Sequence, residues 1–206
     1  MSRQASKRAM IAPPERNLRR NRTILYVSVA IVVVVVIVAV AFASRVPKNA
    51  SNAPIQSTIK VGDAAPDFSV ATTNGPFNLK TTLAGGKPVL LEVFATWCPH
   101  CQRMATVVDG LFSKYGSNVA FVGVSGSPYG IDGSSPETQQ DVIGFQQQFH
   151  VAYPIAFDPD LTVAHLYLQG GYPTFVLIDK TGKVTYINSG EIAQGDLAKA
   201  LDKLST

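Results

Sequence analysis

Two cysteines, Cys98 and Cys101, stand two residues apart in the stretch ATWCPHC, and they are the only cysteines of this 206-residue chain. Cysteines at this spacing support three kinds of site. They can supply half of a zinc site, form a structural disulfide, or act as a redox couple that exchanges disulfides with other thiols. The surrounding sequence discriminates between these three chemistries.

A zinc site is poorly supported by the sequence. Structural zinc sites need four ligands, usually supplied as two ligand pairs, and the chain has no second cysteine pair. The three histidines, His100, His150 and His165, are scattered, and His100 directly precedes Cys101, so the two side chains point apart. We therefore predict no metal site, although thiolates suit soft ions and the sequence alone leaves copper binding open.

A purely structural disulfide is also disfavoured, because a bridge across two residues removes little entropy from the unfolded chain. The pair follows an apolar run and precedes a helix-like stretch over residues 102–115. At a helix start, free backbone N–H groups and the helix dipole favour a thiolate. We therefore predict a redox-active Cys98–Cys101 disulfide, with Cys98 as the attacking thiolate and Cys101, one turn later, as the more covered resolving thiol.

Glu92 is the one charged residue inside the apolar run PVLLEVFA, residues 88–95. A lone carboxylate within a buried strand is costly unless it is paired or protonated. Such a group could take up the proton of the resolving thiol, and we predict this role for Glu92. The alternative is a Glu that faces solvent from an edge strand.

The part of the chain after residue 60 has the alternating strand and helix pattern of one compact α/β domain. Continuous apolar runs before and after the first long helix predict a βαβ unit with both strands buried. The pattern predicts a hairpin with strands over 68–70 and 76–79, strands over 88–95, 119–125, 153–158, 174–179 and 183–188, and helices over 102–115, 137–150, 160–167 and 193–204.

The N-terminal part predicts a membrane anchor. Residues 1–22 carry seven Lys or Arg and one acid, a net charge of +6 in a chain of +4. Residues 24–43 form an uncharged apolar stretch of 20 residues, which as a helix is about 30 Å long and spans a bilayer core. Basic residues before a span stay in the cytoplasm. We expect a cytoplasmic tail (1–22), a transmembrane helix (23–43), a flexible tether (44–60) and an extracytoplasmic domain (61–206).

The N-terminal part also allows two rival interpretations. The small-residue pattern at residues 41–43 fits cleavage of a signal peptide, but the apolar stretch and the region before it are long for one. A basic tail also suits nucleic acid, but the adjoining span favours the membrane. We therefore predict an uncleaved single-pass anchor, a catalytic domain outside the cytoplasm, and no nucleic-acid partner.

The motifs VLLEVFATWCPHC and, far downstream, GGYPTFVLIDKTGKV resemble the thioredoxin superfamily. The opening VGDAAPDFSV and the long insertion between central strands resemble its membrane-tethered TlpA- and ResA-like branch. The resemblance covers residues 61–204. It implies a thioredoxin-like α/β fold, in which helices flank a central mixed sheet that an N-terminal β-hairpin extends.

The resemblance also implies a cis peptide bond before Pro173, packed opposite the cysteines. The strand that starts at Thr174 would accept an extended substrate near Tyr172. Tyr172 is bulkier than the Thr or Val usual at this position, and the pair Pro99-His100 resembles the DsbA-type oxidants. His100 would stabilise the neighbouring thiolate and make the disulfide easier to reduce. The residues predicted to bind substrate are Trp97, Pro99, Tyr172, Pro173 and Thr174.

The predicted function is thiol–disulfide exchange with proteins outside the cytoplasm, by a monomer that needs no cofactor beyond the Cys98–Cys101 disulfide. The CPHC motif favours oxidation of substrates. The fold branch favours reduction, for example of apocytochrome c cysteines, which would require a membrane redox partner to supply electrons. Two alternatives are a peroxiredoxin-like peroxidase, whose usual cysteine motif is missing from residues 91–98, and a Cu(I) chaperone.

Overall fold

The computed structural model describes Tyr26 and residues 55–204. The predicted cytoplasmic tail, nearly all of the predicted transmembrane helix and most of the tether lie outside these residues. Within the described ranges, no helix is long and apolar enough to cross a membrane. All the elements below belong to the compact unit Pro54–Thr206.

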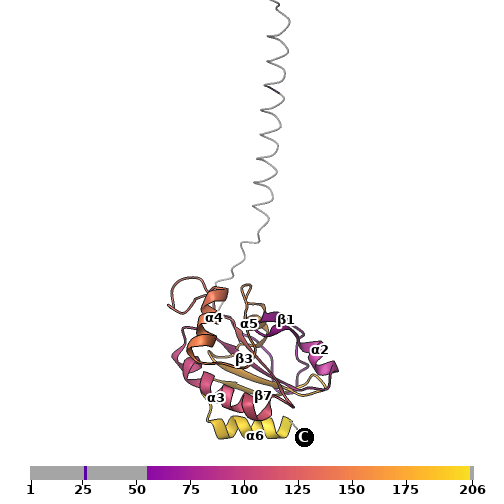
Figure 1. Cartoon of the computed structure of the whole chain (residues 1–206). Helices are drawn as coiled ribbons and strands as arrows, with labels where there is room; N and C mark the ends of the chain where they lie inside the picture. The colour runs from indigo at the N-terminus through magenta and orange to yellow at the C-terminus, as the bar shows by residue number, and fades with distance from the viewer. Residues whose placement is uncertain (1–25, 27–54, 205–206) are drawn as a thin grey trace, which may run out of the picture. The chain divides into compact units, whose positions relative to one another are not determined.

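The described residues build one mixed sheet of seven strands in the order β2-β1-β5-β4-β3-β6-β7 (Figure 1). Strands β3, β4 and β5 run parallel, β6 pairs antiparallel with β3, and β1 pairs antiparallel with β5. The hairpin of β1 and β2 thus extends one edge, as predicted. The strands are β1 (Ser69–Thr72), β2 (Gly75–Asn78), β3 (Val89–Phe94), β4 (Ala120–Ser125), β5 (Ile155–Phe157), β6 (Thr174–Ile178) and β7 (Val184–Ser189).

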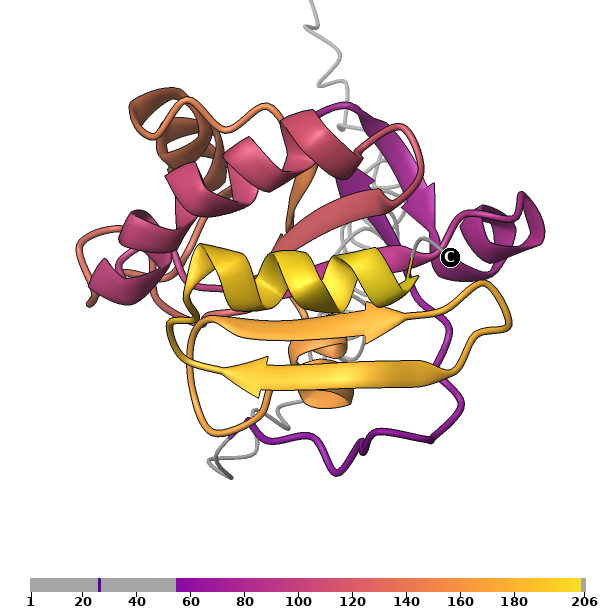
Figure 2. The same ribbon diagram turned by 90° about the horizontal axis from the view of Figure 1, so that it is seen from below.

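Helices cover both faces of this sheet and bury a separate apolar cluster on each. Helices α3, α4 and α6 contribute to one cluster, and α2 and α5 to the other. Figure 2 shows α6, in yellow, running alongside β6, with α5 behind the paired strands β6 and β7. The helices are α2 (Leu79–Ala84), α3 (Pro99–Tyr115), α4 (Gln139–Gln148), α5 (Thr162–Tyr167) and α6 (Gln194–Leu204).

Several element boundaries differ from the prediction, and two of these differences have a clear local cause. Helix α3 begins at Pro99 rather than at residue 102, because proline suits the first helical position, where no N–H partner is needed. The second hairpin strand ends at Asn78, and Leu79 begins a helix that was not predicted. The Asn78 side chain accepts a hydrogen bond from the backbone N–H of Thr81 at 2.7 Å, which caps this helix.

Strand β3 lies inside the sheet and carries the site. All six of its residues are buried, because neighbouring strands flank it and helices cover both faces. Glu92 pairs with Gly123 of β4 and Phe175 of β6, so it does not lie on an edge strand. The strand delivers the chain directly to the turn that contains the cysteines.

Candidate active site

The catalytic turn, residues Ala95 to Cys98, joins β3 to α3. The Cys98 N–H donates to the Ala95 carbonyl at 3.1 Å, and Cys98 occupies the N-cap position with extended backbone. No side chain caps the helix, so its first N–H groups are available to the Cys98 sulfur. Both cysteines are free thiols with low exposure, 4% for Cys98 and 1% for Cys101.

The two thiols differ in acidity although they sit in one turn of helix. The pKa of the Cys98 thiol is lowered to about 6, mainly because the Cys101 thiol donates a hydrogen bond to it. Backbone N–H groups of Cys101 and His100 lower it further, whereas burial acts in the opposite direction. Burial, the hydrogen bond to Cys98 and the Glu92 charge all raise the pKa of Cys101. The geometry thus makes Cys98 the thiolate and keeps Cys101 protonated.

Glu92 is buried beneath the pair, with 1% of its surface exposed. Its Oε2 accepts a hydrogen bond from the Tyr153 hydroxyl at 2.8 Å. Burial raises the pKa of Glu92 to about 7, against the lowering effect of that bond, and the Cys98 charge raises it a little further. A carboxyl group with this pKa can both hold and release a proton near neutral pH, as the predicted proton-handling role requires.

The loop before β6 closes the other side of the site. The predicted cis peptide bond joins Tyr172 to Pro173, and the Cys98 sulfur lies 3.7 Å from the Tyr172 carbonyl oxygen, to which it donates a hydrogen bond when it is protonated. The Tyr172 ring packs edge to face with Trp97, at 6.0 Å between centroids. Thr174 begins β6, and its hydroxyl is held by carbonyls of the same loop. Trp97, Tyr172, Pro173 and Cys98 therefore meet, as the predicted substrate surface requires.

His100 is placed differently from the expectation. Its ring is exposed, and Nδ1 lies 2.7 Å from Glu191 Oε1 and 2.8 Å from Arg103 Nη2. The ring charge does lower the pKa of Cys98, but less than the Cys101 thiol and the backbone N–H groups do. Glu191 supplies an opposing charge at the ring. His100 therefore acts on Cys98 through its backbone more than through its imidazole.

Glu137 is a buried carboxyl at the site that the sequence did not indicate. It is 7% exposed, and Oε1 accepts hydrogen bonds from the Thr96 hydroxyl at 2.9 Å and the Ser125 hydroxyl at 2.6 Å. Its other oxygen, Oε2, is buried without a partner. Burial raises the pKa of Glu137 to about 7. A bare buried oxygen is better tolerated on a neutral acid than on a carboxylate.

Only a tertiary contact reveals Glu137, which the sequence pattern places at the start of a predicted helix over residues 137–150. The helix α4 in fact begins later, after a capping box formed by Thr138 and Asp141. Glu137 is left just outside it, turned toward Thr96 and Ser125. No local signal distinguishes it from other loop acids.

The described part of the chain contains no group of three or more His, Cys, Asp or Glu side chains placed to hold a metal ion. The two free thiols of Cys98 and Cys101 lie together at the start of α3.

Comparisons with known proteins agree with this geometry. The family model described as Redoxin matches residues 60–204. The chain is 30% identical over 152 residues to "Thiol-disulfide oxidoreductase ResA" of Geobacillus thermodenitrificans, covering 72% of this chain and 80% of that protein. It is 30% identical over 146 residues to "Thioredoxin-like protein YneN" of Bacillus subtilis, covering 70% and 80%.

Among solved structures, a putative thiol:disulfide interchange protein DsbE from Chlorobium tepidum matches with a TM-score of 0.63 and 26% identity. The match covers 72% of this chain and all of that one. These similarities confirm the predicted thioredoxin-like α/β fold and the predicted TlpA- and ResA-like relationship.

We predict that Glu92→Gln changes how stability depends on pH. The pKa of Glu92 is raised from 4.5 to about 7 in the folded protein. Between these values the unfolded chain releases a proton that the folded chain keeps, so wild-type stability falls as pH rises, by on the order of 3 kcal/mol from this group. The variant lacks this contribution and should gain stability relative to the wild type from pH 4.5 to 7.

Urea unfolding across pH 4 to 8 measures this difference, which should level off above pH 7. The titration of Glu137 lowers the stability of both proteins by a similar amount over this pH range, so it cancels in the difference between them. Parallel stability curves for the two proteins would show that Glu92 is not the buried titrating acid.

We also predict that Glu137 titrates in a way that Trp97 reports. Trp97 is the only tryptophan of the chain, and the neighbouring Thr96 is bonded to Glu137. In a Cys98→Ser/Cys101→Ser background, Trp97 fluorescence should change with a midpoint near pH 7. Adding Glu137→Gln should abolish the transition, whereas the matched control Glu92→Gln should retain it. The reverse pattern would assign the transition to Glu92 and refute the prediction.

Proposed function

This chain belongs to the Redoxin family and is a thiol–disulfide oxidoreductase, and from that premise we propose that it reduces disulfides of proteins outside the cytoplasm. The observation that carries this proposal is the unequal acidity of its two thiols. A thiolate at Cys98 stands over a protonated Cys101, with a buried acid, Glu92, beneath both.

The proposed exchange runs in two displacements. The Cys98 thiolate attacks one sulfur of a substrate disulfide, which forms a mixed disulfide and releases the other substrate sulfur as a thiolate that takes up a proton from water. Cys101 then transfers its proton to Glu92 and attacks the Cys98 sulfur. This forms the Cys98–Cys101 bond, and the second substrate sulfur leaves and is protonated. Two electrons pass from the protein dithiol to the substrate.

The surroundings of His100 favour reduction over oxidation. Strong oxidants of this superfamily stabilise their thiolate far more, to a pKa of about 3.5, whereas thioredoxin-type reductants have a pKa near 7. The pKa of Cys98 here is about 6. Because Glu191 and Arg103 contact the His100 ring, we infer that the ring of the CPHC motif stabilises the Cys98 thiolate less than the sequence alone indicates.

The substrate should bind across Trp97, Pro99 and Tyr172, beside Pro173. Thr174, which the sequence also predicted to bind substrate, is fully buried and pairs with Val93 of β3 and Ser189 of β7, so it supports this loop from within. The cis peptide places the Tyr172 carbonyl over the Cys98 sulfur, at 3.7 Å. An extended substrate segment that pairs with the backbone of this loop would present its sulfur to Cys98. This arrangement supports exchange with polypeptides rather than with small thiols alone.

The proposed location is the outer face of the cell membrane. It is supported by the basic tail before the uncharged apolar stretch at residues 24–43, which would anchor the chain once with its N-terminus in the cytoplasm. The two cysteines of the chain are both oxidised to the Cys98–Cys101 disulfide after one turnover. A separate dithiol donor, which we propose lies in the membrane, must therefore reduce this disulfide before the next cycle. Protein disulfides, those of apocytochromes c among them, are the proposed substrates.

Trapping experiments test the assigned order of the two thiols. Cys101→Ser removes the resolving thiol, so mixed disulfides between Cys98 and substrates should accumulate in cells and be separable on non-reducing gels. Cys98→Ser removes the attacking thiolate, so it should trap nothing and lose disulfide exchange by at least a hundredfold.

The double variant Cys98→Ser/Cys101→Ser is the control for thiol-independent association. Accumulation of mixed disulfides on Cys98→Ser, and none on Cys101→Ser, would reverse the assignment. Absence of trapped substrates in both, with an active wild type, would contradict exchange through a mixed disulfide.

A further inference from the structure

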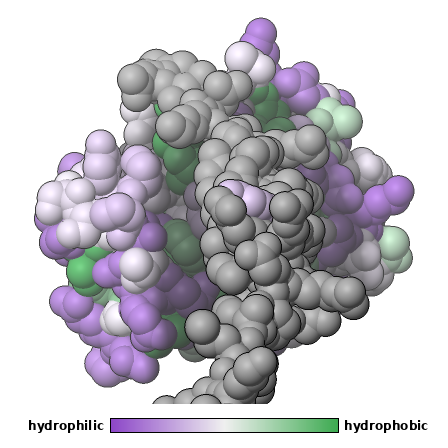
Figure 3. Space-filling model, turned by 90° about the horizontal axis from the view of Figure 1, so that it is seen from above, coloured by the Kyte–Doolittle hydropathy of each residue, from purple (hydrophilic) through white to green (hydrophobic). Residues whose placement is uncertain are grey.

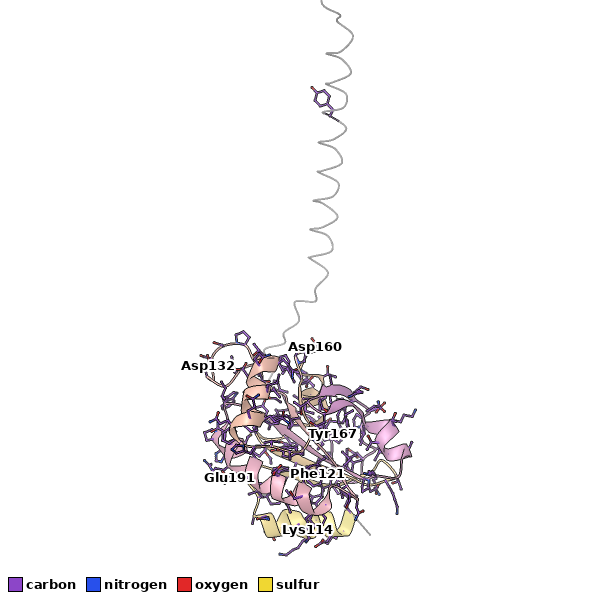
Figure 4. All side chains as sticks on the ribbon, in the orientation of Figure 1. Lys114, Phe121, Asp132, Asp160, Tyr167 and Glu191 are labelled. Atoms are coloured by element: carbon purple, nitrogen blue, oxygen red, sulfur yellow. The ribbon has the colours of Figure 1, made fainter. Side chains whose placement is uncertain are left out.

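The segment after β4, residues 126–138, forms an ordered arm rather than a loose loop. Its backbone closes on itself: Gly130 N–H donates to the Ser135 carbonyl at 2.8 Å, and Tyr129 and Pro136 form a bridge. At the tip, the Asp132 carboxylate accepts hydrogen bonds from Ser134 and Ser135, at 2.6 to 2.9 Å (Figure 4 labels Asp132). The arm therefore presents its exposed side chains from a preorganised frame.

The arm is attached to both walls of the active site. On one side, the Trp97 indole N–H donates to the Ser127 hydroxyl at 2.8 Å. On the other side, the Tyr172 hydroxyl donates to the Gly126 carbonyl at 2.6 Å. Glu137 joins the far end of the arm to Thr96 of the catalytic turn. A polypeptide that reaches Cys98 therefore passes beside the base of the arm.

Exposed apolar side chains gather on this arm. The structure describes four exposed large hydrophobic residues: Tyr129 at 49%, Ile131 at 41%, Val61 at 60% and Tyr26 at 65%. Two of the three in the domain, Tyr129 and Ile131, thus lie on one short segment. On the part of the face that Figure 3 shows in colour, hydrophobic residues form small separate spots among hydrophilic ones. Apolar groups held out on a rigid loop next to a reactive site indicate a binding role.

We propose that the arm is a docking element for the protein substrate, and that Tyr129 and Ile131 contact apolar side chains flanking the substrate cysteine. This inference rests on the proposed function and names its substrate class. Continuity with the site identifies the occupant: Trp97 is bonded to Ser127, and the Ser127 hydroxyl accepts from the Tyr129 N–H at 3.0 Å. Asp132 is hydrogen-bonded within the arm, and Tyr129 and Ile131 are the large apolar side chains that the arm exposes.

The test compares two cyclic disulfide peptides in single-turnover reactions with the reduced full-length protein. One peptide carries leucine on both sides of a cysteine, and the other carries serine. The readout is the ratio of their second-order rate constants, measured by chromatography of the released dithiol peptide. The wild type should prefer the leucine peptide by about tenfold. Tyr129→Ser/Ile131→Ser should bring the ratio close to one, whereas the matched control Val61→Ser should keep the wild-type ratio.

Several outcomes would overturn the docking proposal: a wild-type ratio near one, an unchanged ratio in the double variant, or an equal loss in Val61→Ser. Self-association of the wild type that the double variant loses would assign the arm to a second copy of the chain instead. Reduction of the small disulfide 5,5′-dithiobis(2-nitrobenzoate) distinguishes failure of the docking proposal from failure of the proposed function. A wild-type protein that does not reduce this compound contradicts the proposed function itself. If the double variant does not fold, Ile131→Ser alone serves, with the same ratio as readout.

Discussion

The site depends on the proximity of the Cys101 thiol to the Cys98 sulfur within the first turn of α3, which lowers the pKa of Cys98 and raises that of Cys101. It makes one sulfur acidic and the other reluctant to ionise, and exchange needs that inequality because attack and resolution must occur in sequence. The rest of the fold maintains it. Strand β3 brings the chain to the turn with Glu92 beneath it, and Pro99 starts the helix so that backbone N–H groups face the thiolate.

The residues between the cysteines illustrate why a motif must be interpreted with its tertiary partners. In sequence, His100 next to a thiolate indicates a strongly stabilised reduced form and hence an oxidant. In the folded chain, Glu191 lies against the same ring, as does Arg103 (Figure 4 labels Glu191). Glu191 comes from the segment before α6, 91 residues away along the chain. That contact supplies an opposing charge at the ring, and the His100 ring lowers the pKa of Cys98 less than the Cys101 thiol and the backbone N–H groups do.

Features set by local pattern could be predicted, and features set by distant contacts could not. Apolar runs and the turn residues that bound them predict most strands and helices. They also predict the buried strand with Glu92 and the cysteine pair at the start of a helix. The cis bond at Pro173 followed from resemblance. The short helix after Asn78 is not predicted, because the residues around it resemble a strand and only the Asn78 side-chain cap marks the start of the helix. Glu137 was missed because its burial arises only when the insertion folds back onto Thr96.

The reduction potential of the Cys98–Cys101 couple in the purified full-length protein tests this account most directly. A thiolate stabilised mainly by Cys101 and backbone N–H groups, with the His100 ring engaged by Glu191, predicts a potential between the thioredoxin value of about −270 mV and about −200 mV. Equilibration with glutathione buffers and alkylation of free thiols gives the value. A potential near −120 mV, that of the strong oxidant DsbA, would contradict it and make His100 the dominant influence on Cys98.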